Sequence, residues 1–102
     1  MERFKPKKID EEYYVAKYLL VSYIYDKYLR TRGTAIFVDS MDIVRKFHLA
    51  NYSRKRIAMR ITKLMVKLCK LGLAQAHKPS GHRTFIISRK DVPKVLNTLI
   101  DL

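Results

Sequence analysis

The residues with the clearest chemical capacity are cations concentrated in one half of the chain. Of the 22 Lys and Arg residues, thirteen lie between residues 43 and 90, and none of the nine Asp and Glu residues lies there. Positive and negative charges cancel in the rest of the chain, so the formal net charge of +13 belongs to this segment. A surface of one sign repels itself unless an anionic partner offsets it. The pattern favours a polyanion, with nucleic acid first. The alternative, an anionic membrane surface, usually requires an exposed apolar helix face beside the cations.

Two histidines and one cysteine are the other side chains that could carry out chemistry. His77 and His82 have a separation close to that of zinc-finger histidines, but Cys69 is the only cysteine and structural zinc normally needs four ligands. The sequence places no nucleophile beside a base and has no glycine-rich phosphate loop. We therefore expect no metal, no cofactor and no enzymatic activity, with Cys69 packed inside.

Length and composition limit the class of protein. The chain has 102 residues, of which 48% are hydrophobic, which predicts one folded domain and excludes a disordered tail. A single cysteine and the absence of a secretion pattern predict a cytoplasmic protein. The longest apolar stretch, residues 13–25, carries Lys17 and is shorter than the roughly twenty residues of a membrane helix. Asn and Gln are scarce while Lys, Arg, Tyr and Ile are abundant, a bias typical of hot environments.

The first third of the chain predicts an arm, a long helix and a strand. Residues 1–9 are basic and aperiodic, which predicts a flexible arm before a single domain spanning 10–102. Asp10 is suited to cap a helix that runs to Leu29 and stops before Gly33. The short β-branched and aromatic run 34–38 predicts a strand.

The remaining chain predicts three more helices and a hairpin. Ser40 is suited to cap a short helix that ends near residue 48, and Ser53 or Asn51 to cap a third, amphipathic helix that Gly72 closes. Residues 73–77 and 83–88 predict two strands joined by a turn at 78–82. Asp91 is suited to cap a last helix with Pro93 in its first turn. The predicted class is mainly α with a small antiparallel β-sheet.

This order of helix, strand, helix, helix, strand, loop, strand resembles the winged helix-turn-helix family over residues 11–88. Regulators of the MarR-like and PadR-like kind carry a similar run of an apolar helix face, Leu-Gly-apolar, a Gly-Arg wing and an aromatic-apolar strand. Here that run comprises Ile57, Ile61, Leu64, Leu71, Gly72, Leu73, Gly81, His82, Arg83, Phe85, Ile87 and Ser88. Small winged proteins of archaea and their viruses are similar in length and composition. The third helix is one turn longer than the family pattern, and the turn at 48–52 lacks the usual glycine.

The resemblance implies a transcription regulator that binds double-stranded DNA, with the third helix in the major groove and the hairpin loop as a wing. With Ile57, Ile61 and Leu64 facing inward, most cations of the third helix fall on its outer arc. The candidate recognition-helix residues are Ser53, Arg54, Lys55, Arg56, Arg60, Lys63 and Lys67, and the candidate wing residues are Lys78, His82 and Arg83. The arginines are candidates for base contacts, because their planar fork fits guanine edges, and the lysines after Arg60 for backbone contacts.

The first helix carries more apolar surface than one core needs. The candidate dimer interface is Tyr14, Tyr18, Val21 and Tyr25, which predicts a homodimer about a two-fold axis. Two third helices would then enter successive major grooves about 34 Å apart on a near-palindromic site. The alternative for these tyrosines is base stacking on single strands.

Other functions remain open at this point. The same fold could serve as a non-specific architectural DNA-binding protein or as a protein-interaction module, because a fold alone does not determine function. RNA binding also fits the charge, because both nucleic acids carry phosphate.

Overall fold

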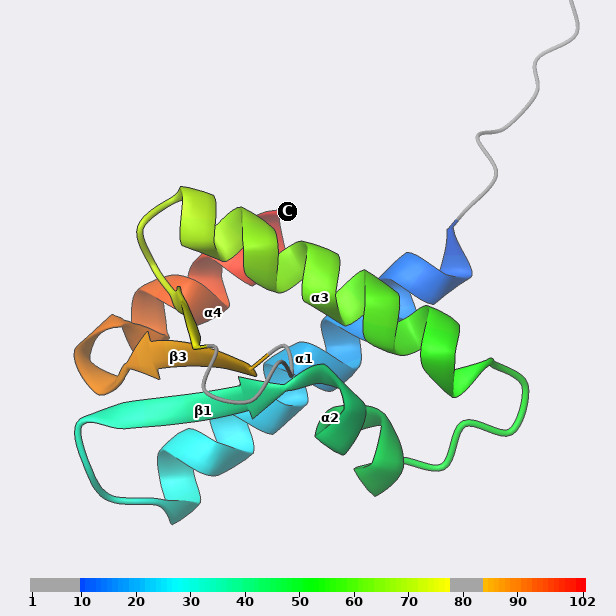
Figure 1. The fold of residues 1–102 in the computed structure, drawn as a ribbon, viewed down its shortest axis with the longest axis horizontal. Helices are drawn as coiled ribbons and strands as arrows, with labels where there is room; N and C mark the ends of the chain where they lie inside the picture. Colours follow the sequence, from blue (N-terminus) through cyan, green and yellow to red (C-terminus); the bar gives the residue numbers. More distant parts are fainter. Residues whose placement is uncertain (1–9, 78–83) are drawn as a thin grey trace, which may run out of the picture.

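A computed structural model describes residues 10–77 and 84–102 (Figure 1). In chain order the elements are α1 (Glu11–Arg30), β1 (Ala35–Asp39), α2 (Ser40–Lys46), α3 (Arg54–Lys70), β2 (Gln75–His77), β3 (Thr84–Ser88), a 3₁₀ turn η1 (Arg89–Asp91) and α4 (Val92–Asp101). The predicted class, mainly helical with a small antiparallel sheet, is confirmed. The predicted arm, residues 1–9, lies outside the described residues.

Local signals fix three of the helix ends as predicted. The Asp10 carboxylate accepts a hydrogen bond from the Tyr13 N–H at 3.1 Å and caps α1. The Ser53 hydroxyl accepts one from the Arg56 N–H at 3.4 Å and caps α3. Gly72 has a left-handed φ of +76°, and α3 closes with a 2.9 Å bond from the Leu73 N–H to the Leu68 carbonyl.

One predicted cap is wrong, and another holds the cap position without the expected side-chain hydrogen bond. Asp39, not Ser40, caps α2, because its carboxylate accepts the Met41 and Asp42 N–H groups at 2.9 and 3.3 Å. The Ser40 hydroxyl is buried and instead bonds the Thr62 hydroxyl of α3 at 2.8 Å. Asp91 makes no side-chain cap, because the chain enters α4 from η1 and Asp91 already has helical backbone angles.

The three strands form one antiparallel sheet in the order β1-β3-β2. In its register Val38 pairs with Phe85, and Ala76 pairs with Phe85 from the other side. Burial alternates along β1 and β3, as expected for a sheet with one face on the core. The strand predicted at 73–77 begins only at Gln75, because Leu73 and Ala74 are buried in the connection that follows α3.

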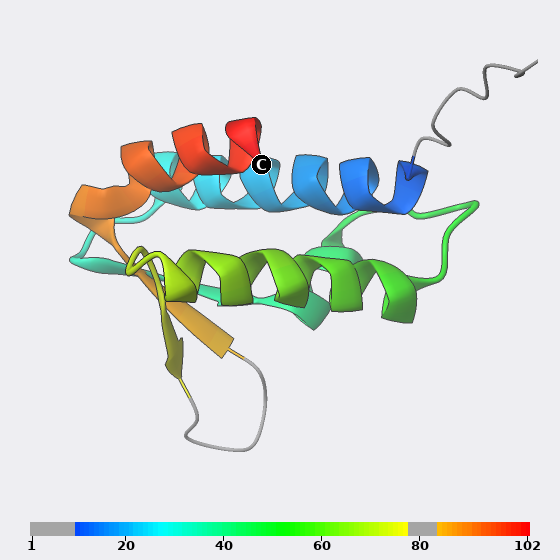
Figure 2. The same ribbon diagram turned by 90° about the horizontal axis from the view of Figure 1, so that it is seen from above.

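The four helices and the strands β1 and β3 contribute buried side chains to one core. The buried side of α1, including Leu20 and Ile24, packs against α3, whose Ile61 and Leu68 are fully buried. Figure 2 shows α4 lying along α1 on one side of the molecule, with α3 on the other and the β2–β3 hairpin extending beyond α3. The Lys17 ammonium fixes α4 to α1 by donating to the Ile100 carbonyl at 2.9 Å.

The Ser40–Thr62 bond joins α2 to α3 inside the protein, so breaking it should be costly. Thr62→Val would leave the Ser40 hydroxyl buried without a partner, and we expect the free energy of unfolding to fall by about 1–3 kcal/mol. Urea denaturation measures this. Adding Ser40→Ala removes the stranded hydroxyl and should recover part of the loss. A single variant as stable as the wild type would contradict the role of this bond.

Candidate nucleic-acid interface

The exposed side of α3 is lined with cations. We call this side the lysine face; it comprises Lys55, Met59, Lys63, Val66, Lys67 and Lys70, all of them exposed. The opposite side of the helix, including Ile57 and Leu64, is buried against the core. The predicted inward side of the third helix is therefore confirmed. Because α3 contains no Asp or Glu, no carboxylate of its own neutralises the lysine face.

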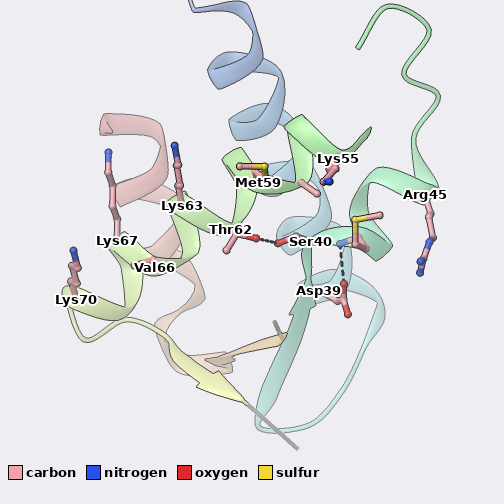
Figure 3. A pocket seen from close by; sticks show the side chains of 12 residues that line it. Asp39, Ser40, Arg45, Lys55, Met59, Thr62, Lys63, Val66, Lys67 and Lys70 are labelled. Atoms are coloured by element: carbon pink, nitrogen blue, oxygen red, sulfur yellow. Dashed lines mark hydrogen bonds between the residues drawn. The ribbon is translucent and has the colours of Figure 1, made fainter. Parts of the chain in front are cut away.

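The lysine face forms one wall of a groove of about 860 Å³. The end of β1 and the helix α2 form the other wall, with Asp39, Met41 and Arg45. Figure 3 shows the side chains of Lys63, Lys67 and Lys70 extending from α3 in a common direction, while Arg45 projects from α2. The bonded Ser40–Thr62 pair lies between the two walls and holds them at a fixed separation. The groove is therefore basic along α3, while its other wall carries one cation, Arg45, and one acid, Asp39.

Two arginines of α3 point to a different side. The Arg56 guanidinium contacts the Glu12 carboxylate at 2.9 Å, and Arg60 contacts Asp10 at 2.8 Å and Glu12 at 3.6 Å. These carboxylates belong to the N-terminal end of α1, where the helix dipole favours acids. Ion pairs at a protein surface contribute little to stability. They do reduce the positive potential that Arg56 and Arg60 present to a polyanion.

The other predicted recognition residues have distinct positions. Ser53 caps α3 through its hydroxyl. Arg54 and Lys55 are exposed in the first turn of α3, and Lys55 borders the groove. The predicted wing residues Lys78, His82 and Arg83 lie outside the described residues.

Sequence reasoning missed one cation of the site. Arg45 lies on α2 and is not among the predicted site residues, yet it borders the same groove as the lysines of α3. It also contacts Asp42 at 3.5 Å. Its membership of the carboxylate-free run 43–90 was the one signal that could have placed it in the site.

Polar side chains near the start of α3 contact acidic side chains at the N-terminal end of α1. The Tyr52 hydroxyl donates a hydrogen bond to the Glu11 carboxylate at 3.1 Å. This hydrogen bond raises the pKa of Tyr52, because it stabilises the protonated phenol. The negative charge of the carboxylate also disfavours the phenolate. Tyr52, Arg56 and Arg60 thus all engage acids of α1.

The residues considered for a metal site each have a different structural environment. His77 packs edge-to-face on Phe37, with ring centroids 5.7 Å apart. Cys69 is half-buried on α3, and burial raises the pKa of its thiol. Among residues 10–77 and 84–102, no three His, Cys, Asp or Glu side chains gather closely enough to hold a metal ion.

One structural finding and three comparisons with known proteins complete the description. Within the described part of the chain, none of the helices combines the length and the apolar character needed to cross a membrane. Searches with family models, among curated proteins and among solved structures gave no match to this chain.

The raised pKa of Cys69 predicts a thiol that reacts slowly with disulfide reagents. At pH 7 the folded chain should contain less thiolate than the unfolded chain, so we expect slower reaction with a disulfide reagent such as Ellman's reagent. Comparing initial rates in buffer and in urea tests this. The difference due to ionisation should narrow once the pH exceeds the raised pKa. Equal rates at pH 7 would show that the thiol is not held protonated by the fold.

Proposed function

We propose that the protein binds double-stranded DNA through the lysine face, as a transcription regulator of the winged helix-turn-helix kind. In this proposal α3 enters the major groove and the β2–β3 hairpin acts as the wing. The observation that carries it is the lysine face itself: four lysines on the exposed side of a 17-residue helix that has no carboxylate. The order of helices and strands and the sheet order β1-β3-β2 support the same proposal.

The shape of the site suits a duplex. The major groove of DNA admits an α-helix, and α3 presents one long side that no other described element covers. Lysine is a flexible point charge that suits phosphate, so Lys63, Lys67 and Lys70 fit the DNA backbone. Met59 and Val66 are exposed on the same face. Apolar side chains at such positions can contact thymine methyl groups.

A second candidate function, non-specific architectural binding to DNA, is favoured by one observation. Arg56 and Arg60, two arginines in the first two turns of α3 that were candidates to read guanine, are engaged by Glu12 and Asp10. The cations left on the lysine face are lysines, which suit phosphates of any sequence. Competition between random duplex and a duplex selected from a random pool separates the two functions, because only a regulator prefers the selected one.

The first test removes two lysines of the lysine face. Lys63→Ala with Lys67→Ala should weaken duplex binding by roughly tenfold or more and make the dependence of log K on log salt shallower by about two, one for each lost phosphate contact. Fluorescence anisotropy between 50 and 200 mM salt measures both. Lys90→Ala with Lys94→Ala is the matched control, because it also removes two exposed cations and both lie away from α3. Equal losses in the control and the double variant would assign binding to net charge alone.

The second test releases the two arginines. Glu12→Gln removes the carboxylate that contacts both Arg56 and Arg60, so we expect DNA affinity to rise by about three- to tenfold, or about 1 kcal/mol. Asp26→Asn controls for net charge, because Asp26 also pairs with an arginine, Arg30, but at the other end of α1. Arg60→Ala should cost less affinity than Lys63→Ala. The opposite ranking would place Arg60, not the lysines, at the centre of the interface.

A further inference from the structure

The outer side of α1 is an apolar ridge that nothing in the described structure covers. We call it the tyrosine stripe; it comprises Tyr14, Tyr18, Val21, Tyr25 and Leu29. The three tyrosines and Leu29 are 53–64% exposed, and Val21 is half-buried. Their spacing of four, three, four and four residues keeps them on one side of the helix. Four large apolar side chains on one ridge form the kind of exposed patch that marks an interaction surface.

Grooves run along both sides of the tyrosine stripe. A groove of about 460 Å³ lies between α1 and α4 and is closed by Ile100, which is itself 61% exposed. Another, of about 380 Å³, lies between α1 and the end of α2 at Phe47. A ridge beside a groove is complementary to itself, because the ridge of a second copy can fill the groove of the first.

The sequence of α1 favours an antiparallel pair of copies. With a two-fold axis between Val21 and Ser22, Tyr18 of one copy faces Tyr25 of the other, and Tyr14 faces Leu29. Val21 and Ser22, at the axis, are smaller than the tyrosines on either side and permit closer approach of the helices. The same register places Glu11, at the acidic end of α1, opposite Arg32, just beyond its basic end. A parallel pair would bring like charges and like helix-dipole ends together instead.

The tyrosine stripe and the lysine face point in opposite directions. α1 and α3 pack through their buried sides, so the exposed side of each helix faces away from the other helix. In Figure 2, α1 and α4 lie on one side of the molecule and α3 on the other. A two-fold axis in the plane of an α1 interface reverses any direction perpendicular to that plane. The lysine faces of two such copies would therefore point outward on opposite sides of the dimer.

We propose that a second copy of this chain covers the tyrosine stripe, and that the resulting dimer holds two separate DNA duplexes, or two distant segments of one, at the same time. This inference rests on the proposed function for its DNA half. It differs from the expectation drawn from the sequence, in which both third helices enter successive grooves of one duplex. That geometry requires both lysine faces on the same side of the dimer.

The dimer half is tested by the oligomeric state, which needs no DNA. At micromolar concentration, sedimentation should give a mass twice the 12.1 kDa of the chain. Tyr18→Glu with Tyr25→Glu places like charges opposite each other and should give the monomer. Tyr18→Glu with Tyr25→Lys places opposite charges there and should retain the dimer. Both positions are more than half exposed, and circular dichroism verifies the fold. A monomeric wild type, or equal dissociation of both variants, overturns the proposed interface.

The bridging half is tested by capture of a second duplex. One biotinylated duplex is held on beads with the protein, and a fluorescent duplex is added. The wild type should retain the fluorescent duplex, whereas Tyr18→Glu with Tyr25→Glu should bind either duplex but lose capture. A wild-type dimer that protects two adjacent turns of one duplex and captures no second one overturns bridging. If no duplex binds at all, the proposed function and bridging fail together, while sedimentation still decides the dimer interface.

Discussion

The packing of α1 against α3 is the contact on which the other features of this protein depend. Both helices bury one apolar side in it, and burial of such side chains is the main favourable term in folding. The contact brings the acidic end of α1 beside Arg56 and Arg60. It also leaves each helix with one outward side. One of these sides is cationic and the other aromatic, so a single packed pair of helices gives the molecule two unlike surfaces.

The charges in the first turn of α3 are not explained by helix stability, unlike those in its last turn. Cations in a last turn complement the negative end of the helix dipole, so Lys67 and Lys70 stabilise the helix. Arg54, Lys55 and Arg56 occupy the first turn, where no acid is present and where a cation is opposed by the dipole at a cost of about 0.3–1 kcal/mol each. Residues retained against local stability are expected at functional surfaces. The first turn of α3 therefore supports a role toward an anionic partner independently of the net charge.

Much of the fold could be predicted from the sequence because its signals are local. Asp10, Ser53 and Gly72 act on backbone groups within five residues, and the apolar period of α3 identified its buried side. The errors have long-range causes. Ser40 is a good cap by type, but its hydroxyl is taken by Thr62, 22 residues away. The cations of α3 were assigned to one surface from their own helix, whereas partners 44 residues away at Glu12 divide them between two. A charge count along the chain does not reveal pairs that only the folded helices form.

Arg89 ties the sheet to the end of α1. Arg89 follows β3 directly. Its guanidinium donates a hydrogen bond to the Tyr28 carbonyl and lies 4.8 Å from the centre of the Tyr28 ring. Its backbone N–H donates to the Thr34 carbonyl at 2.8 Å. The hairpin strand β3 therefore cannot tilt without moving the last turns of α1 or breaking these contacts. A force applied to the hairpin is transmitted to the same helix that carries the tyrosine stripe. Arg89 is therefore a mechanical link between the sheet and α1.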